Sequence, residues 1–313
     1  MEKSKDRLER MERQIAILGK PFQRIAAVDG SLLTTEQITK ASETHCRLFC
    51  TRSMIGIYMS HLKAWRTMID NGDGYAMIME DDCSLVPSFQ NELKLVLDEL
   101  NTINPEWDFL YLGCFGACDP NKKYDVIGYA QRMMTHILKK SKMNSEDLTY
   151  SFVPETPIGF HCYIVSHKCA KYLVNAMKKA SYHVDVAFLE HADSLNVYAT
   201  KKQLSYQYTS AESSTQTDSF PIIPNTIFEK IVCSRNISYG YYFSAPIFAI
   251  GKFNANFYLF LFVLIALLIP NEYSYFLLYY LVLETILSPM NLMNILLWGA
   301  IAILVINAKQ RYS

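Results

Sequence analysis

The chain has 313 residues, with 30 basic and 30 acidic side chains. This length permits one large domain or two of ordinary size, each with a buried core. The balanced charge lacks the basic excess of nucleic-acid-binding domains, so we expect no nucleic-acid partner. The composition is that of a folded protein, but residues 253–308 contain no Lys or Arg and only two acids, Glu272 and Glu284.

Helical and strand patterns alternate through the first two thirds of the chain. Apolar spacing and helix-ending residues predict helices over residues 3–18, from 36, and over 55–69, 89–100 and 167–179. Apolar runs bounded by turn residues predict strands over residues 22–28, 75–79, 107–112 and 158–166. The run 75–79 is almost wholly apolar, which is typical of a strand buried on both faces. This alternation predicts an α/β domain with a parallel or mixed sheet, whose ligands bind at the carboxyl ends of its strands.

The composition divides the chain into three parts. We assign residues 1–210 to a catalytic domain, the Ser-, Thr- and Pro-containing residues 211–252 to a linker, and 253–308 to apolar helices. A bilayer crossing needs about 20 helical residues, so this tail is long enough for two crossings or three short ones. A buried helical subdomain is the alternative, but a stretch so poor in charge is hard to cover with polar surface. We therefore predict a membrane tail.

The charges around the tail predict its orientation. Lys252 precedes it, and Lys309 and Arg311 follow it, whereas the connections inside it carry no positive charge. By the positive-inside rule both ends face the cytosol, which requires an even number of crossings. The eight cysteines are scattered, and the charged residues 1–13 contain no signal-peptide core. We therefore expect a membrane protein whose catalytic domain lies in the cytosol.

Three acids, Glu80, Asp81 and Asp82, directly follow the apolar run 75–79. Carboxylates gathered at the end of a strand repel one another unless a cation or hydrogen-bond donors compensate. Mn²⁺ or Mg²⁺, bound by carboxylate and diphosphate oxygens, is such a cation and neutralises charge on a nucleotide leaving group. A solvated turn is the alternative interpretation of the triplet.

The triplet stands among segments that together resemble glycosyltransferase family 25. These are Arg24-Ile25-Ala26-Ala27-Val28-Asp29-Gly30, Ile55-Gly56-Ile57-Tyr58-Met59-Ser60-His61-Leu62-Lys63-Ala64-Trp65, residues 75–82, and Gly159-Phe160-His161-Cys162-Tyr163-Ile164-Val165-Ser166. The family includes lipopolysaccharide-type and collagen galactosyltransferases, and the resemblance covers about residues 4–210. It implies a GT-A-like, Rossmann-related fold and a nucleotide-sugar donor, commonly UDP-galactose.

The resemblance also implies site residues. Glu80, Asp81 and Asp82 would form the metal and donor-phosphate region, with Asp82 as the likeliest direct ligand. His161 would be a further metal ligand or diphosphate contact, and a core histidine is the alternative. Asp185 would be the general base that takes the proton of the acceptor hydroxyl. A structural carboxylate at a helix start is the alternative for Asp185.

Five further residues would lie near the donor nucleotide. Arg24 and Asp29 fit this role, although a turn at a strand end explains them equally. Ser60, His61 and Lys63 would lie on a helix beside the donor pocket, with helix packing as the alternative for His61.

The function that follows is inverting transfer of a hexose, galactose, from a UDP-sugar to a glycan or glycolipid acceptor at a membrane, as in lipopolysaccharide biosynthesis. Family members usually begin with a hydrophobic strand before the first helix, and this sequence begins inside that region. The alternative is therefore a catalytically inactive, membrane-bound binding or scaffold protein.

Overall fold

The computed structural model describes residues 5–20, 22–114, 118, 148–155, 157–207, 220–224, 227, 243, 247–250, 253–288 and 291–312. It divides into two compact units. The first contains residues 1–43 and 52–208, and the second contains residues 44–51 and 209–313. Most of the predicted linker, residues 211–252, lies outside the described residues.

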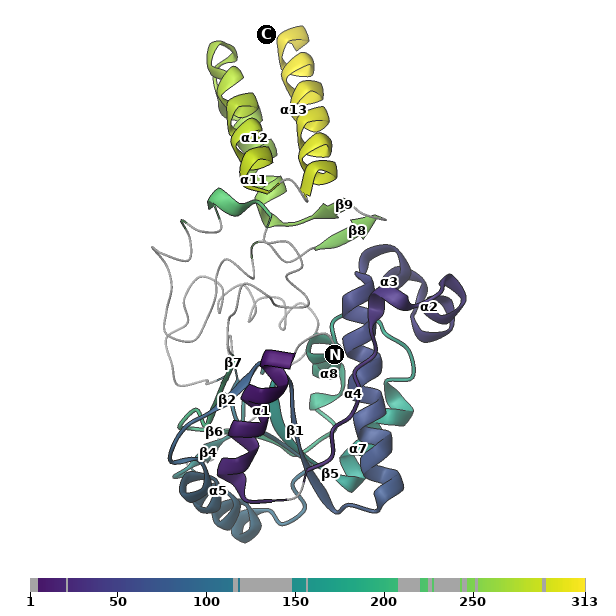
Figure 1. The fold of residues 1–313 in the computed structure, drawn as a ribbon, viewed down its shortest axis with the longest axis vertical. Helices are drawn as coiled ribbons and strands as arrows, with labels where there is room; N and C mark the ends of the chain where they lie inside the picture. The colour runs from purple at the N-terminus through teal and green to yellow at the C-terminus, as the bar shows by residue number, and fades with distance from the viewer. Residues whose placement is uncertain are drawn as a thin grey trace. The chain divides into compact units, whose positions relative to one another are not determined.

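A five-stranded mixed sheet forms the centre of the first unit (Figure 1). Its order is β1 (Tyr75–Met79), β5 (Cys162–Ser166), β3 (Phe109–Tyr111), β6 (Val197–Thr200) and β4 (Ser151–Phe152). Only β3 and β6 run parallel, and the other neighbours are antiparallel. The predicted α/β class is confirmed, and three of the predicted strands form, two of them shortened.

The edge position of β1 corrects one prediction. Its Tyr75 side chain is 46% exposed, and its other residues are only partly buried. Every residue of β3 and β5 is buried, because these strands have a neighbour on each side. The sequence predicts that the apolar run 75–79 is buried on both faces, and this prediction is wrong. An apolar composition does not reveal how many strands lie beside the strand that it predicts.

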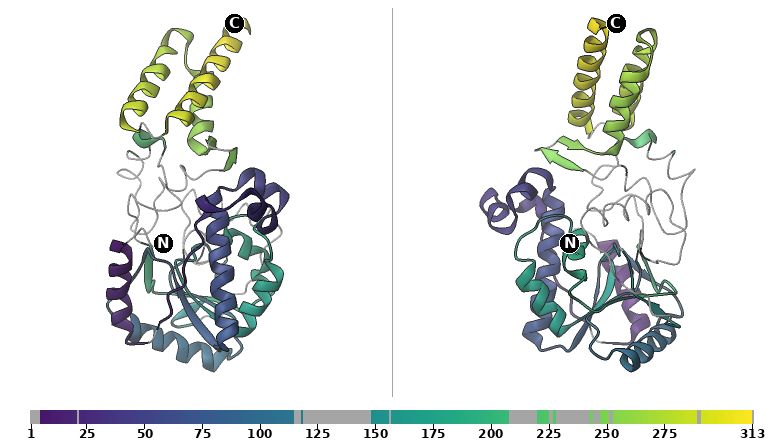
Figure 2. Two further views of the ribbon diagram at one scale, coloured as in Figure 1. Left: turned by 45° about the vertical axis from the view of Figure 1, so that its right-hand side comes forward. Right: turned by 180° about the vertical axis from the view of Figure 1, so that it is seen from behind.

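Helices cover both faces of this sheet (Figures 1 and 2). The covering helices are Lys5–Leu18 (α1), Arg52–Asn71 (α4), Phe89–Ile103 (α5), His167–Ala176 (α7) and Val184–Ala192 (α8). A further short helix, Thr35–Ala41 (α2), contacts α4 and has no buried residue. On one face, Phe89, Val96 and Leu100 of α5 pack with buried strand residues, and Leu18 of α1 joins them. On the other, Trp65 of α4 hydrogen-bonds Tyr163 of β5, and Phe188 of α8 packs on Phe109 of β3. The amphipathic patterns that predicted α1, α4 and α5 therefore match their packing, whereas α8 was not predicted from the sequence.

The segment 22–28 forms no strand, and that prediction is wrong. The residues run beside α4 without regular secondary structure, and side chains of that helix bind their backbone. Ser60 Oγ accepts from Val28 N at 2.8 Å, and Lys63 Nζ donates to Ala26 O at 2.9 Å. Backbone groups satisfied in this way need no neighbouring strand.

Apolar helices dominate the second unit. Its elements are α3 (Thr44–Phe49), β8 (Phe248–Ile250), β9 (Phe253–Ala255), α11 (Phe257–Leu268), α12 (Tyr275–Leu287) and α13 (Leu292–Tyr312). Phe262 of α11 and Trp298 of α13 stack in its core. Large apolar side chains remain exposed on the helices, as with Leu268 at 73%, Ile286 at 70% and Leu304 at 68%. Among the described residues, one helix, Leu292–Arg311, is long and apolar enough to cross a bilayer.

A buried carboxylate joins the apolar helices to a short preceding segment. Glu284 of α12 is fully buried and accepts hydrogen bonds from Ile222 N and Ile223 N, both at 2.9 Å. Asn256 donates to Phe220 O at 2.8 Å and accepts from Leu259 N at 3.1 Å, which caps α11. The polar residues within this apolar unit thus bind backbone groups of the unit itself.

Candidate active site

The acidic triplet occupies the turn between β1 and β2 (Cys83–Leu85). β2 pairs with β7 (Ser205–Gln207) in a two-stranded antiparallel ribbon that places Cys83 opposite Gln207. Glu80 N donates to His161 O at 2.9 Å, so the turn is also attached to the segment before β5. Residues far apart in the sequence therefore fix the position of all three carboxylates.

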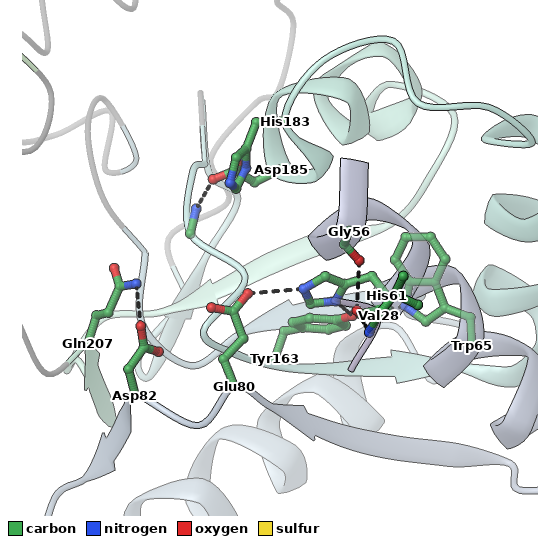
Figure 3. A network of polar contacts seen from close by, with 12 residues as sticks. Val28, Gly56, His61, Trp65, Glu80, Asp82, Tyr163, His183, Asp185 and Gln207 are labelled. Carbon is green, nitrogen blue, oxygen red and sulfur yellow. Dashed lines mark hydrogen bonds and ion pairs between the residues drawn. The ribbon is translucent and has the colours of Figure 1, made fainter. Parts of the chain in front are cut away.

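Glu80 is held by a buried polar chain (Figure 3). His61 of α4 places Nε2 3.0 Å from Glu80 Oε1 and Nδ1 2.9 Å from the Tyr163 hydroxyl, to which Trp65 Nε1 also donates at 2.9 Å. Burial opposes ionisation of Glu80, but the hydrogen bond and charge of His61 hold the pKa of Glu80 below its ordinary value. Of the predicted site residues, His61 and Glu80 are thus brought together.

Asp81 points to a different partner. Its Oδ1 lies 3.0 Å from Arg7 Nη1 of α1, and the Asp81 side chain is 43% exposed. The Arg7 side chain is only 9% exposed, so the ion pair is open to solvent on the Asp81 side alone. Its effect is to place a cation of the first helix beside the acidic turn.

The two carboxylate oxygens of Asp82 differ in their contacts. Gln207 Nε2 donates to Oδ2 at 2.9 Å, whereas the buried Oδ1 accepts no hydrogen bond from any residue that the structure describes. Burial and, next, the charge of Glu80 raise the pKa of Asp82 to about 7. A buried carboxylate oxygen without a donor is a suitable ligand for a hard divalent cation. Asp82 Oδ1 therefore suits one ligand position of the metal that the sequence predicts.

His161 lies in the core with Ser205. Its Nε2 is 3.2 Å from Ser205 Oγ, and burial holds its pKa below the ordinary value, which favours neutral imidazole. Across the described residues, no three His, Cys, Asp or Glu side chains lie together as a metal-binding group. The predicted ligand set of Glu80, Asp82 and His161 is thus not assembled here, and the contacts of His161 favour the alternative of a core histidine.

The remaining donor-site candidates bind nearby backbone. Asp29 accepts from Ser31 N at 3.0 Å and Ser31 Oγ at 2.6 Å, at the start of a 3₁₀ turn. Ser60 and Lys63 hold the segment 26–28, as described above, and Arg24 lies exposed just before it. The contacts of Asp29 agree with the alternative of a turn, and the donor-binding roles of all four residues remain predictions.

Asp185 is buried at the start of α8 and is paired with His183 (Figure 3). Its Oδ1 lies 2.6 Å from His183 Nδ1 and accepts from Val186 N at 2.8 Å, while Oδ2 accepts from Gly159 N at 3.1 Å. Burial alone would raise the pKa of Asp185, but these bonds and the charge of His183 hold it below its ordinary value. A carboxylate so stabilised is a weak base.

Sequence reasoning missed three members of this site. His183 was not singled out, although it stands two residues before Asp185, and a nearby histidine is a frequent carboxylate partner. Tyr163 lay in a quoted motif but was given no role. Gln207 has no sequence signal, because only the pairing of β2 with β7 brings it to Asp82.

Comparison with known proteins identifies the family of this chain. The sequence model of glycosyltransferase family 25, described as an LPS biosynthesis protein family, matches residues 1–188. That range includes the acidic turn, the His61 network and the His183–Asp185 pair. The chain belongs to glycosyltransferase family 25.

Individual relatives match a shorter region. Human procollagen galactosyltransferase 2 is 26% identical over 121 residues, covering 36% of this chain and 19% of the relative. Zebrafish (Danio rerio) procollagen galactosyltransferase 1 is 27% identical over 116 residues, or 34% and 19% of the two chains. The human inactive glycosyltransferase 25 family member 3 is 23% identical over 116 residues, or 34% and 20%. The matched region spans about a fifth of the length of these relatives.

Proposed function

We propose that this protein is a GT-A-like glycosyltransferase that transfers a hexose, galactose, from UDP-galactose to a hydroxyl of a glycan or glycolipid at a membrane. Family membership supports the class of reaction, and the procollagen galactosyltransferases among its relatives support the sugar. The structural observation that carries the proposal is the buried Oδ1 of Asp82 in the acidic turn after β1, which accepts no hydrogen bond from the described part of the chain.

Asp82 and Glu80 are the residues that would hold Mn²⁺ or Mg²⁺. Bound there with donor phosphate oxygens, the ion would neutralise charge on the departing diphosphate. Gln207 orients the Asp82 carboxylate, and His61 keeps Glu80 ionised and in place. Asp81, His161, Arg24, Asp29, Ser60 and Lys63 are proposed to complete the surroundings of the donor.

The apolar helices of the second unit are proposed to hold the enzyme at a membrane beside its acceptor. The exposed apolar side chains of α11, α12 and α13 support this, because a surface of this kind is unfavourable in water. α13 has the length of a crossing helix, whereas α11 has only 12 residues. The domain boundaries proposed from the sequence, at residues 210 and 252, remain part of this proposal.

A second candidate function is a catalytically inactive, membrane-bound binding protein. Relatives named as inactive family members favour it. Nucleotide binding alone would not separate the two candidates, since an inactive relative can retain a donor site. Turnover separates them.

The test of the proposed site is binding of UDP measured by calorimetry on the detergent-purified full chain, with Mn²⁺ and with EDTA. We expect Mn²⁺-dependent binding that Asp82→Ala weakens by about tenfold or more, equivalent to about 1.4 kcal/mol. The matched control is Asp98→Ala, which removes an exposed acid of α5 that pairs with Lys94. Equal UDP affinity for the wild type and Asp82→Ala would contradict the site.

A further inference from the structure

His183 and Asp185 form a polar pair beside the acidic turn, and Asp185 alone was assigned a role from the sequence. We propose that His183 is the general base of sugar transfer and that Asp185 is a positioning residue that orients its ring. This inference rests on the proposed transferase function.

The geometry gives the two residues different roles. The Asp185 carboxylate accepts at His183 Nδ1, 2.6 Å away, so a neutral imidazole carries its proton on Nδ1 and presents a lone pair at Nε2. The His183 side chain is 22% exposed, against 9% for Asp185. Both Asp185 oxygens already accept hydrogen bonds from the protein. A substrate hydroxyl can therefore reach the histidine more readily than the carboxylate.

The His183 side chain does not cap the helix that it precedes, and it is bound to Asp185 instead. His183 occupies the N-cap position of α8, yet its side chain makes no capping hydrogen bond. It turns to Asp185 instead. The side chain of an N-cap residue usually accepts a hydrogen bond from the first N–H groups of its helix, and the His183 side chain does not do so.

A three-residue segment connects the pair to the acidic turn. Gly159 N donates to Asp185 Oδ2, and His161 O accepts from Glu80 N. Three residues span at most about 11 Å, so the two attachment points lie within the width of a bound sugar and its phosphates. Gly159 has a φ of +109°, a conformation that side-chain-bearing residues rarely adopt. The turn that aims this N–H at Asp185 therefore requires glycine.

Electrostatics agree with this placement. Burial opposes protonation of His183, but the neighbouring Asp185 carboxylate holds the pKa of His183 above its ordinary value. Glu80 in the acidic turn acts in the same direction more weakly. Conversely, His183 lowers the pKa of Glu80. The two carboxylates and the imidazole thus lie within electrostatic reach of one another.

The chemical step is a direct displacement. His183 Nε2 takes the proton of the acceptor hydroxyl as its oxygen forms a bond to the anomeric carbon of the donor sugar. The bond from that carbon to the β-phosphate oxygen breaks, and its electron pair leaves with the nucleoside diphosphate. The products are the glycosylated acceptor, the nucleoside diphosphate and protonated His183, which Asp185 stabilises. In donor hydrolysis, water takes the place of the acceptor.

The test measures hydrolysis of UDP-galactose with Mn²⁺ from pH 5 to 9 on the detergent-purified full chain. At saturating Mn²⁺, which would keep the Asp82 carboxylate ionised, we expect the kcat/KM of the wild type to fall at acidic pH as His183 becomes protonated. His183→Gln should lower kcat about 10²- to 10⁴-fold, abolish that acidic limb and leave UDP binding unchanged. In Asp185→Asn, kcat/KM should still fall at acidic pH, but at a lower pH than in the wild type, because the carboxylate that raises the pKa of His183 is gone.

The matched control is His167→Gln, which changes a histidine at the start of α7 that contacts Asp73 O. It should leave the rate and the pH profile unchanged. Wild-type rate and an unchanged acidic limb in His183→Gln would overturn the inference while leaving the transferase proposal intact. If His183→Gln does not unfold cooperatively, the variant is misfolded and its rate is uninformative. The pH profile of Asp185→Asn is then the test, and an acidic fall in kcat/KM at the same pH as in the wild type would overturn the inference. A wild-type protein that neither binds UDP nor hydrolyses any donor would overturn both proposals.

Discussion

His61 Nε2 lies 3.0 Å from Glu80 Oε1, while Nδ1 of the same ring lies 2.9 Å from the Tyr163 hydroxyl. One imidazole therefore joins the acidic turn to the buried middle of the sheet. Because β5 is covered on both faces, its tyrosine cannot move without disturbing the core. The position of Glu80 is thereby tied to the buried core of the first unit.

The first prediction concerns the Tyr163 hydroxyl. Tyr163→Phe leaves His61 Nδ1 and Trp65 Nε1 without their partner in a buried place, which should cost about 1–3 kcal/mol of unfolding free energy. Urea unfolding measures this loss. Tyr206→Phe, on the exposed part of β7, is the matched control and should change stability by less than about 0.5 kcal/mol. Equal stability of the two variants would show that the network contributes nothing.

A second prediction concerns the packing of residues 28–30 on α4. A Cβ at Gly56 would lie 2.7 Å from Val28 O and 2.8 Å from Gly30 N, so Gly56→Ala should destabilise the protein by about 1–3 kcal/mol. At Gly74 an added Cβ meets nothing within 4 Å. Thermal unfolding should therefore show a lower melting temperature for Gly56→Ala and almost no change for the control, Gly74→Ala. If Gly56→Ala also left the melting temperature unchanged, this segment would not pack against α4 as described.

Part of the fold and part of the candidate site could be predicted from the sequence. Helix periodicity and apolar runs gave most helices of the first unit and the strand before the acids, because local patterning decides those elements. The same reasoning failed for residues 22–28, where side chains of α4 replace a neighbouring strand. The acidic turn was predicted from its composition, whereas its partners Gln207 and Tyr163 depend on strand pairings that local patterns do not reveal.

The third prediction concerns the pH dependence of stability in EDTA. The pKa of Asp82 is about 7 in the folded protein and 3.8 ordinarily, so wild-type stability relative to an uncharged variant declines as pH rises between these values. Asp82→Asn should therefore unfold at a higher temperature than the wild type at pH 8 and at the same temperature below pH 4. Added Mn²⁺ should stabilise the wild type at pH 8 and not the variant. A wild type as stable as Asp82→Asn at pH 8 in EDTA would contradict the burial of this carboxylate.

The fourth prediction concerns the apolar unit. The full chain should stay with the membrane pellet after alkaline carbonate extraction, and Leu304→Lys on the exposed apolar surface of α13 should weaken that retention.

The orientation of the C-terminus is a separate test. A tag after residue 313 should be digested by protease added to the cytosolic side if both ends lie there. Protection of the tag would place the C-terminus on the other side and contradict this orientation.

The most direct test of the account is turnover of a panel of UDP-sugars by the detergent-purified full chain, with Mn²⁺ and with EDTA. We predict Mn²⁺-dependent hydrolysis of UDP-galactose in preference to the other donors, lost in Asp82→Ala and retained in Asp98→Ala. Absence of turnover for every donor, with Mn²⁺ and UDP both failing to bind, would contradict the transferase function. Mn²⁺-dependent UDP binding without turnover would instead support the inactive binding protein.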